Sequence, residues 1–195
     1  TLTQNPDERK AIFEKAVRLY PNDKRAHNGL AQIAYAKGDM ETAKAELAQA
    51  AELPEANANA ALIAVREHHL DQAESLLGKA LTASNYNEVL GNLQVARGNF
   101  VQAAQTLKGV NTNTAAIAQI LTKDYVSASQ TLMAVPHRDA MTAYLAAIVS
   151  ARTGDVKGAA QALAGAIAAD RSLAGLAQTD LELAKVLAAH PELVK

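Results

Sequence analysis

The 195-residue chain contains no cysteine and no tryptophan, and aromatic residues make up only 4% of it. Without cysteine there is no disulfide framework, no thiolate ligand for zinc and no cysteine nucleophile. The absence leaves the compartment open, because cytosolic and envelope proteins can both lack cysteine. The scarcity of aromatic and β-branched residues argues against a β-sandwich or barrel, whose pleated surfaces these residues fill best.

Excess charge and long apolar runs are also absent. The chain has 19 basic and 20 acidic residues, a net charge of -1, which provides no general attraction to nucleic acid or acidic lipid. No apolar run approaches the ~18 residues that a transmembrane helix needs. We therefore expect no nucleic-acid partner and no membrane span. The chain begins at Thr1 rather than Met, and we interpret it as a processed protein or an excised fragment.

Alanine is abundant, with 44 residues, and leucine follows with 23. Alanine has the highest helix propensity of all residues. Its small side chain also lets two helices approach closely. The composition therefore predicts an all-α protein.

One pattern recurs five times: an apolar stretch, a tight turn, one apolar residue and then Ala-x-x-x-Leu. The alanines of the five copies are Ala43, Ala73, Ala103, Ala128 and Ala159, spaced by 30, 30, 25 and 31 residues. Apolar residues recur at three- and four-residue intervals on both sides of each turn, which predicts two amphipathic helices per copy. Such a short hairpin cannot bury its own apolar face, so it is stabilised by stacking on its neighbours.

The turns between the paired helices carry a consistent signature. Glycine stands where the first helix must end in a left-handed residue, at Gly38, Gly98 and Gly154. A polar residue that can cap the second helix follows, as Asp39, Asn99, Asp124 and Asp155. We expect these residues to set the helix boundaries.

This array resembles the tetratricopeptide (TPR) repeat, in which Leu-Gly in the first helix precedes Ala-x-x-x-Phe in the second. Leu90-Gly91 with Ala103 and Leu107 match that pattern, and Leu30-Ala31 matches it with alanine in place of glycine. No copy has the tryptophan of the pattern, and His27 holds that position in the first copy. The resemblance covers about residues 6 to 170. It implies a right-handed superhelical α-solenoid of stacked helix hairpins that binds other proteins.

We predict a single TPR-like solenoid over residues 1–195. Its expected parts are a half repeat at 6–22, helix pairs at 24–53, 54–83, 84–109, 110–135 and 138–169, and capping helices at 171–195. The fourth pair has room for a first helix of only about two turns, Ala115 to Leu121. At 1.5 Å per residue this helix is ~7 Å shorter than its neighbours. The shortening would either leave a notch in the surface of the solenoid or reflect a neutral deletion in a loop.

Catalytic and metal-binding patterns are missing. There is no phosphate-binding glycine loop, no Gly-x-Ser-x-Gly and no His-Glu-x-x-His. Glu67, His68 and His69 form the densest polar cluster, but they occupy the turn that holds Gly-Asp in other copies, and a metal site needs three or four converging ligands. We expect a structural turn there rather than a catalytic or metal site. We also expect His27 to be partly buried and hydrogen-bonded, and we expect no enzyme activity and no cofactor.

If the first helix of each pair lines a concave groove, as the resemblance implies, the side chains projecting there can be assigned by aligning the turns. The candidate partner-binding residues are Arg25, Asn28, Gln32, Tyr35, Asn59, Arg66, Asn85, Glu88, Asn92, Asn113, Tyr144 and Arg152. Side-chain amides can both donate to and accept from an extended peptide backbone, and tyrosine is favoured at interfaces. The asparagines could equally serve as helix caps.

Charge is unevenly distributed along the chain. Of the 39 charged residues, 24 lie in positions 1–100 and only 9 in positions 101–170. A charge-poor surface is typical of an interface core, although small neutral residues can also make an inert surface. The first interpretation predicts that this flank docks a partner or another domain of the same chain.

Together these features predict a non-enzymatic protein–protein interaction scaffold that binds a protein or peptide through its groove or through the charge-poor flank. The alternative is a helical accessory domain of a larger envelope protein or enzyme, whose functional site lies outside this sequence. Alanine-rich, cysteine-free arrays resemble those of bacterial cell-envelope proteins. On that resemblance we expect a periplasmic or envelope-associated location.

Overall fold

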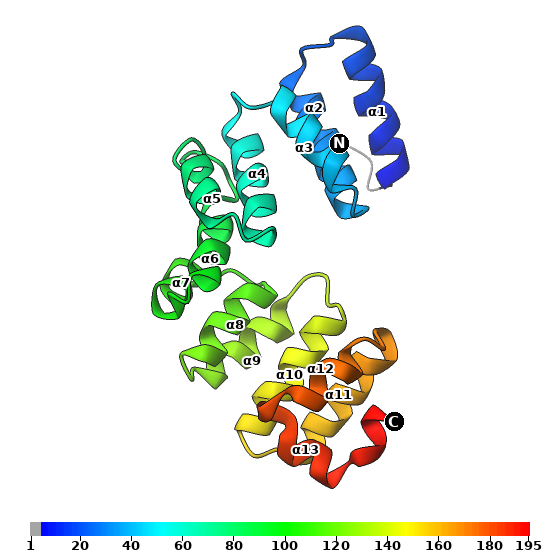
Figure 1. Ribbon diagram of the computed structural model, residues 1–195, viewed down its shortest axis with the longest axis vertical. Helices are drawn as coiled ribbons and strands as arrows, with labels where there is room; N and C mark the ends of the chain where they lie inside the picture. The colour runs from blue at the N-terminus through cyan, green and yellow to red at the C-terminus, as the bar shows by residue number, and fades with distance from the viewer. Residues whose placement is uncertain (1–4) are drawn as a thin grey trace. The chain divides into compact units, whose positions relative to one another are not determined.

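The computed structural model describes residues 5–195, and that part of the chain contains thirteen α helices, two short 3-10 helices and no strand (Figure 1). The prediction of an all-α solenoid is confirmed. The chain divides into two compact units, of which the first ends at Arg97 and the second begins at Gly98. Each unit is described by itself. The prediction of one continuous array over residues 1–195, with its individual pair boundaries, stays a prediction.

The first unit contains α1 (Pro6–Leu19), α2 (Lys24–Ala36), α3 (Met40–Gln49), α4 (Pro54–Arg66), α5 (Leu70–Leu77) and α6 (Tyr86–Ala96). Helices α2 and α3 pack as one hairpin, and α4 and α5 pack as the next. Helix α1 packs on α2 although none of its residues is buried. The ring of Phe13 lies over Gly29, where an added Cβ atom would come within 2.5 Å of the ring. Any larger residue at position 29 would force the Phe13 ring to shift.

The second unit contains α7 (Phe100–Thr106), α8 (Asn113–Leu121), α9 (Tyr125–Ala134), α10 (Ala140–Arg152) and α11 (Val156–Ala169). The pairs α8/α9 and α10/α11 form its hairpins. Four short helices follow, namely α12 (Leu173–Thr179), η1 (Leu181–Leu183), α13 (Ala184–Ala189) and η2 (Pro191–Val194). They bury Leu183 and Val186 in the same core as Leu163 of α11, so the C-terminal segment covers the last hairpin.

The turns within the pairs have the predicted geometry. Gly38, Gly98 and Gly154 adopt φ values of 80°, 77° and 87°. The same left-handed position holds His68 with φ 61° and Lys123 with φ 65°. Capping bonds follow, since Asp39 accepts from the Thr42 N–H at 3.1 Å, Asp124 from the Ser127 N–H at 3.1 Å and Asp155 from the Gly158 N–H at 2.8 Å. Asn99 precedes α7 but makes no side-chain capping bond.

The repeated alanines lie where the packing is tightest. Ala43, Ala73, Ala103, Ala128 and Ala159 are each 0% exposed. The leucine four residues after each alanine is also buried, at 4% exposure or less. Since alanine ends at Cβ, paired helices can approach closely, and the leucines fill the remaining space. The abundance of alanine is thus a consequence of helix packing.

The first helix of the fourth pair is short, as predicted. Helix α8 has 9 residues, whereas α2, α4 and α10 have 13 each. The four missing residues correspond to about 6 Å of helix. The helix begins at Asn113, two residues before the predicted start. Within residues 5–195 no helix is long and apolar enough to cross a lipid bilayer.

Candidate partner-binding surface

Three asparagines from the first helices of the first unit are hydrogen-bonded in series. The Asn59 Nδ2 atom of α4 donates to Asn28 Oδ1 of α2 at 2.9 Å, and the Asn85 Nδ2 atom, just before α6, donates to Asn59 Oδ1 at 3.1 Å. We call this series the amide ladder. Each side chain is half-buried. The bonds fix the orientation of the amides, and the Oδ1 atom of Asn85 is buried without a hydrogen-bond partner.

A small hollow of about 70 Å³ adjoins the middle of the ladder. Its walls include Gln32, Tyr35, Asn59 and Leu62, and Ala31, Leu47 and Ile63 complete it. A cavity needs only about 10–15 Å³ to hold a water molecule, so this hollow has room for a small side chain. The surface therefore combines oriented amides with an apolar depression.

Tyr35, which lines this hollow, is in contact with a cationic side chain. The Arg66 guanidinium of α4 lies 5.7 Å from the centre of the Tyr35 ring of α2. Such a cation–π contact is worth about 0.5–1 kcal/mol at an exposed site, so it favours this orientation of the tyrosine ring only modestly. Arg66 itself is exposed, so its charge remains accessible.

The other predicted groove residues of the first unit are less engaged. Arg25, Gln32 and Glu88 are exposed, and no contact given by the structure joins Arg25 or Glu88 to the ladder. Asn92 is half-buried, and its Nδ2 atom donates to the Glu88 carbonyl of its own helix at 2.8 Å. The structure therefore brings together Asn28, Gln32, Tyr35, Asn59, Arg66 and Asn85.

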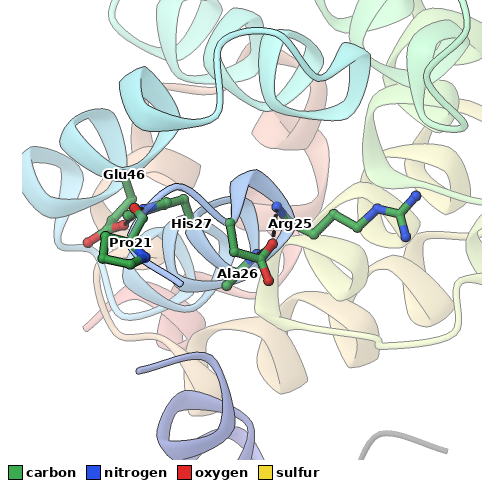
Figure 2. A network of polar contacts seen from close by, with 6 residues as sticks. Pro21, Arg25, Ala26, His27 and Glu46 are labelled. Carbon is green, nitrogen blue, oxygen red and sulfur yellow. Dashed lines mark hydrogen bonds and ion pairs between the residues drawn. The ribbon is translucent and has the colours of Figure 1, made fainter. Parts of the chain in front are cut away.

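His27 precedes the first ladder residue and is 7% exposed. Its Nδ1 atom lies 2.6 Å from Glu46 Oε2 of α3, and its Nε2 atom lies 2.8 Å from the Pro21 carbonyl oxygen (Figure 2). Both partners are acceptors, so only the doubly protonated imidazolium can donate to both. Burial by itself lowers the pKa of His27, but the bonds to Pro21 and Glu46 and the charges of Glu46 and Asp23 outweigh it and raise the pKa above its ordinary value. The predicted hydrogen bonding of His27 is confirmed, and the side chain is more fully buried than the partial burial that was expected.

The predicted groove residues of the second unit have structural roles. Tyr144 was expected to project into a groove, but it is only 2% exposed, and its hydroxyl donates to Asp180 at 2.8 Å. Burial is the largest cause of a raised pKa for Tyr144, and the hydrogen bond to Asp180 raises the pKa further. The side chain is enclosed because the C-terminal segment packs over α10, and Asp180 belongs to that segment. In this structure the ring of Tyr144 is not accessible to a partner.

Asn113 and Arg152 are also engaged within the second unit. Asn113 Nδ2 donates to Asp139 at 3.0 Å, and Asn113 Oδ1 accepts from the Thr142 hydroxyl at 2.9 Å. These bonds tie the start of α8 to the start of α10. Arg152 is exposed and forms an ion pair with Glu182 of η1.

The Glu67-His68-His69 segment forms the turn between α4 and α5, as predicted. Glu67 pairs with Lys44 at 3.2 Å and lies 3.6 Å from His69 Nδ1. Among residues 5–195 no three histidine or acidic side chains are grouped so that they could hold a metal ion.

Comparison with known proteins agrees with the helical-repeat fold. A family model of the tetratricopeptide repeat matches residues 24–57, which comprise α2, α3 and the start of α4. Residues 24–57 therefore resemble a tetratricopeptide repeat. The crystal structure of PilW, described as a widely conserved type IV pilus biogenesis factor, superposes with a TM-score of 0.62 at 20% identity and covers 94% of this chain and 91% of that one. That likeness shows the fold. No curated protein matches the chain.

Sequence reasoning assigned the ladder residues individually but did not find the bonds between them. The available signal was the spacing of the asparagines, since Asn28, Asn59 and Asn85 lie 31 and 26 residues apart, close to the repeat length. The partner of His27 was also missed. Glu46 lies 19 residues away on the second helix of the hairpin, and no local pattern marks it as a partner.

Proposed function

We propose that the protein is a non-enzymatic scaffold that binds an extended segment of a partner protein along the amide ladder of the first unit. The observation that carries the proposal is the serial bonding of Asn28, Asn59 and Asn85 beside an apolar hollow. The TPR match supports a protein-interaction scaffold of this general kind.

The chemistry of the ladder suits a peptide backbone. A primary amide has two N–H donors and a carbonyl oxygen with two lone pairs. The ladder engages one N–H of Asn59 and one of Asn85, so donor and acceptor capacity remains for a ligand. The amides are already ordered by their mutual bonds, which lowers the entropy lost when a ligand binds. The hollow would take one side chain of the bound segment, with Tyr35 in its wall and Arg66 against the Tyr35 ring.

We further propose that the protein acts in the bacterial cell envelope, either by itself or as a helical accessory domain of a larger envelope protein or enzyme. The likeness to PilW, a pilus biogenesis factor, supports the envelope location. The charge-poor stretch 101–170 is a second candidate contact surface for the same scaffold. The domains encoded beside this sequence would distinguish a protein that acts by itself from an accessory domain of a larger one.

The ladder can be tested with a random-peptide display selection on the whole protein, followed by calorimetry on the selected peptides. Asn59→Ala removes the central amide, and we expect at least tenfold weaker binding, which corresponds to about 1.4 kcal/mol. Asn87→Ala, at an exposed position of α6 outside the ladder, is the matched control and should bind as the wild type does. Unchanged affinity in Asn59→Ala would overturn the ladder as the binding surface.

A further inference from the structure

The second unit contains a larger groove that is separate from the amide ladder. It has a volume of about 230 Å³ and lies between the C-terminal part of α8 and the facing side of α10. Its apolar walls include Ile117 and Leu121 of α8 and Ile148 of α10, with Tyr125 at the start of α9. Leu121 is 49% exposed. The groove therefore presents an accessible apolar surface.

The rim of this groove is positively charged in a stretch with few charges. Only nine charged residues occur in positions 101–170, and two of them, Lys123 and Arg152, line the groove. Glu182 also lines it and forms an ion pair with Arg152. No ion pair given for residues 5–195 joins Lys123 to a carboxylate. One positive charge beside the apolar walls is thus left without an acidic partner.

The backbone at Lys123 adds an independent observation. Lys123 lies in the turn just after α8, with a φ of 65°, at the position that is glycine in the turns at Gly38, Gly98 and Gly154. Glycine adopts this conformation without strain, whereas a Cβ atom is crowded there by the following carbonyl. His68 has the same conformation in the α4–α5 turn, but it lines none of the hollows described here. At position 123 the strained conformation places a lysine side chain at the edge of the groove.

We propose that this groove binds a peptide segment of a partner protein in which an apolar side chain adjoins an acidic residue. The apolar side chain fills the space between α8 and α10, and the carboxylate lies against the Lys123 ammonium group. This site is independent of the amide ladder, since all its residues belong to the second unit and their bonds involve no ladder residue.

The test is a random-peptide display selection on the whole protein carrying Asn59→Ala, so that the ladder does not dominate the result. We expect enriched peptides to combine an apolar residue with a neighbouring Asp or Glu. Lys123→Glu should reverse this preference to Lys or Arg. Lys157→Glu, at an exposed position of α11 away from the groove, makes the same charge change and should leave the acidic preference intact.

Binding of one selected acidic peptide then measures the contact directly. We expect Lys123→Gln to weaken binding about fivefold or more. Raised salt should weaken binding to the wild-type protein, because the Lys123 contact is electrostatic, and should have less effect on binding to the variant. Peptide-induced changes in the NMR spectrum should centre on residues 117–125 and 145–152. Far-ultraviolet circular dichroism of both Lys123 variants verifies folding.

The proposal is overturned by any of three outcomes. Selection could enrich no peptide or show no acidic preference, the preference could persist in Lys123→Glu, or the spectral changes could lie outside the groove. None of these outcomes bears on the proposal that the amide ladder binds a partner. Conversely, if Asn59→Ala did not weaken peptide binding at the ladder, the proposal for the groove would still stand. The two proposals therefore fail separately.

Discussion

The two units are built from the same hairpin but present different surfaces. Ala43 in the first unit and Ala159 in the second are both fully buried at equivalent positions. The first helices of the first unit present hydrogen-bonded amides, whereas α8 and α10 present an apolar groove with a basic rim. Of the 39 charges, 24 lie in the first unit. Packing between helices thus constrains the inward positions strongly and leaves the outward positions free to acquire different chemistry.

The largest expected effect concerns what the two units share. Leu47→Ala and Leu163→Ala each remove a buried leucine beside a repeated alanine, and each should destabilise its own unit by about 2–5 kcal/mol. Chemical denaturation measures the loss. Leu121→Ala, at an exposed position, is the control and should cost far less. If only one of the two substitutions destabilised its unit, the two units would not share the same packing at these positions.

A second prediction separates the units by pH. Because the pKa of His27 is raised in the folded protein, its contribution to stability is complete below the unfolded value of about 6.5 and is lost as pH rises through the folded value. The free energy of unfolding of the first unit should therefore fall as pH rises above about 6.5. Denaturation at a series of pH values measures this slope.

The His27 slope should depend on its acidic partner. Glu46→Gln keeps the size of the side chain but removes the charge, and we expect it to lower the NMR titration midpoint of His27 and to reduce the slope. Lys10, Glu14 and Arg18 of α1 line the same hollow as Glu46. Because salt screens these neighbouring charges, the wild type and the variants are measured at one salt concentration. Glu41→Gln on the exposed side of α3 is the control. A midpoint unaffected by Glu46→Gln would refute the assigned pairing.

A third prediction uses the two strained turns. Lys123→Gly and His68→Gly each relieve a left-handed non-glycine residue, and each should stabilise the protein by about 1 kcal/mol. Only Lys123→Gly should weaken binding of acidic peptides to the second unit. Thermal unfolding and calorimetry measure the two effects. Equal peptide binding in both variants would show that the Lys123 side chain does not contribute to binding in the groove.

The smallest expected effect on stability concerns the charge-poor flank. Val126 and Met133 on α9 are 71% and 66% exposed, so Val126→Lys and Met133→Lys should change stability by no more than about 0.5 kcal/mol. If the flank docks a partner, the double variant should lose that partner while retaining peptides bound to the ladder. Retention of every bound protein would identify the flank as an inert surface.

Much of the fold could be predicted because its signals are local. Gly38 and Asp39 mark a helix end and the next helix start by their own backbone and capping chemistry. The repeat of Ala-x-x-x-Leu marks the inward face of each second helix. The candidate surface was predicted less well. Gln32, Tyr35 and Asn59 do line one hollow. Tyr144 was also predicted to project into the groove, but it is buried.

The sequence by itself determined the helical class, the glycine turns, the short α8 and the repeated alanines, since these depend on residues within a few positions of one another. The tertiary structure alone decided the amide ladder, the bond between His27 and Glu46 and the enclosure of Tyr144 by Asp180. These contacts join residues 19 to 36 positions apart. Successive residues point about 100° apart around a helix, so small rotations between stacked helices determine which side chains meet, and no local pattern records them.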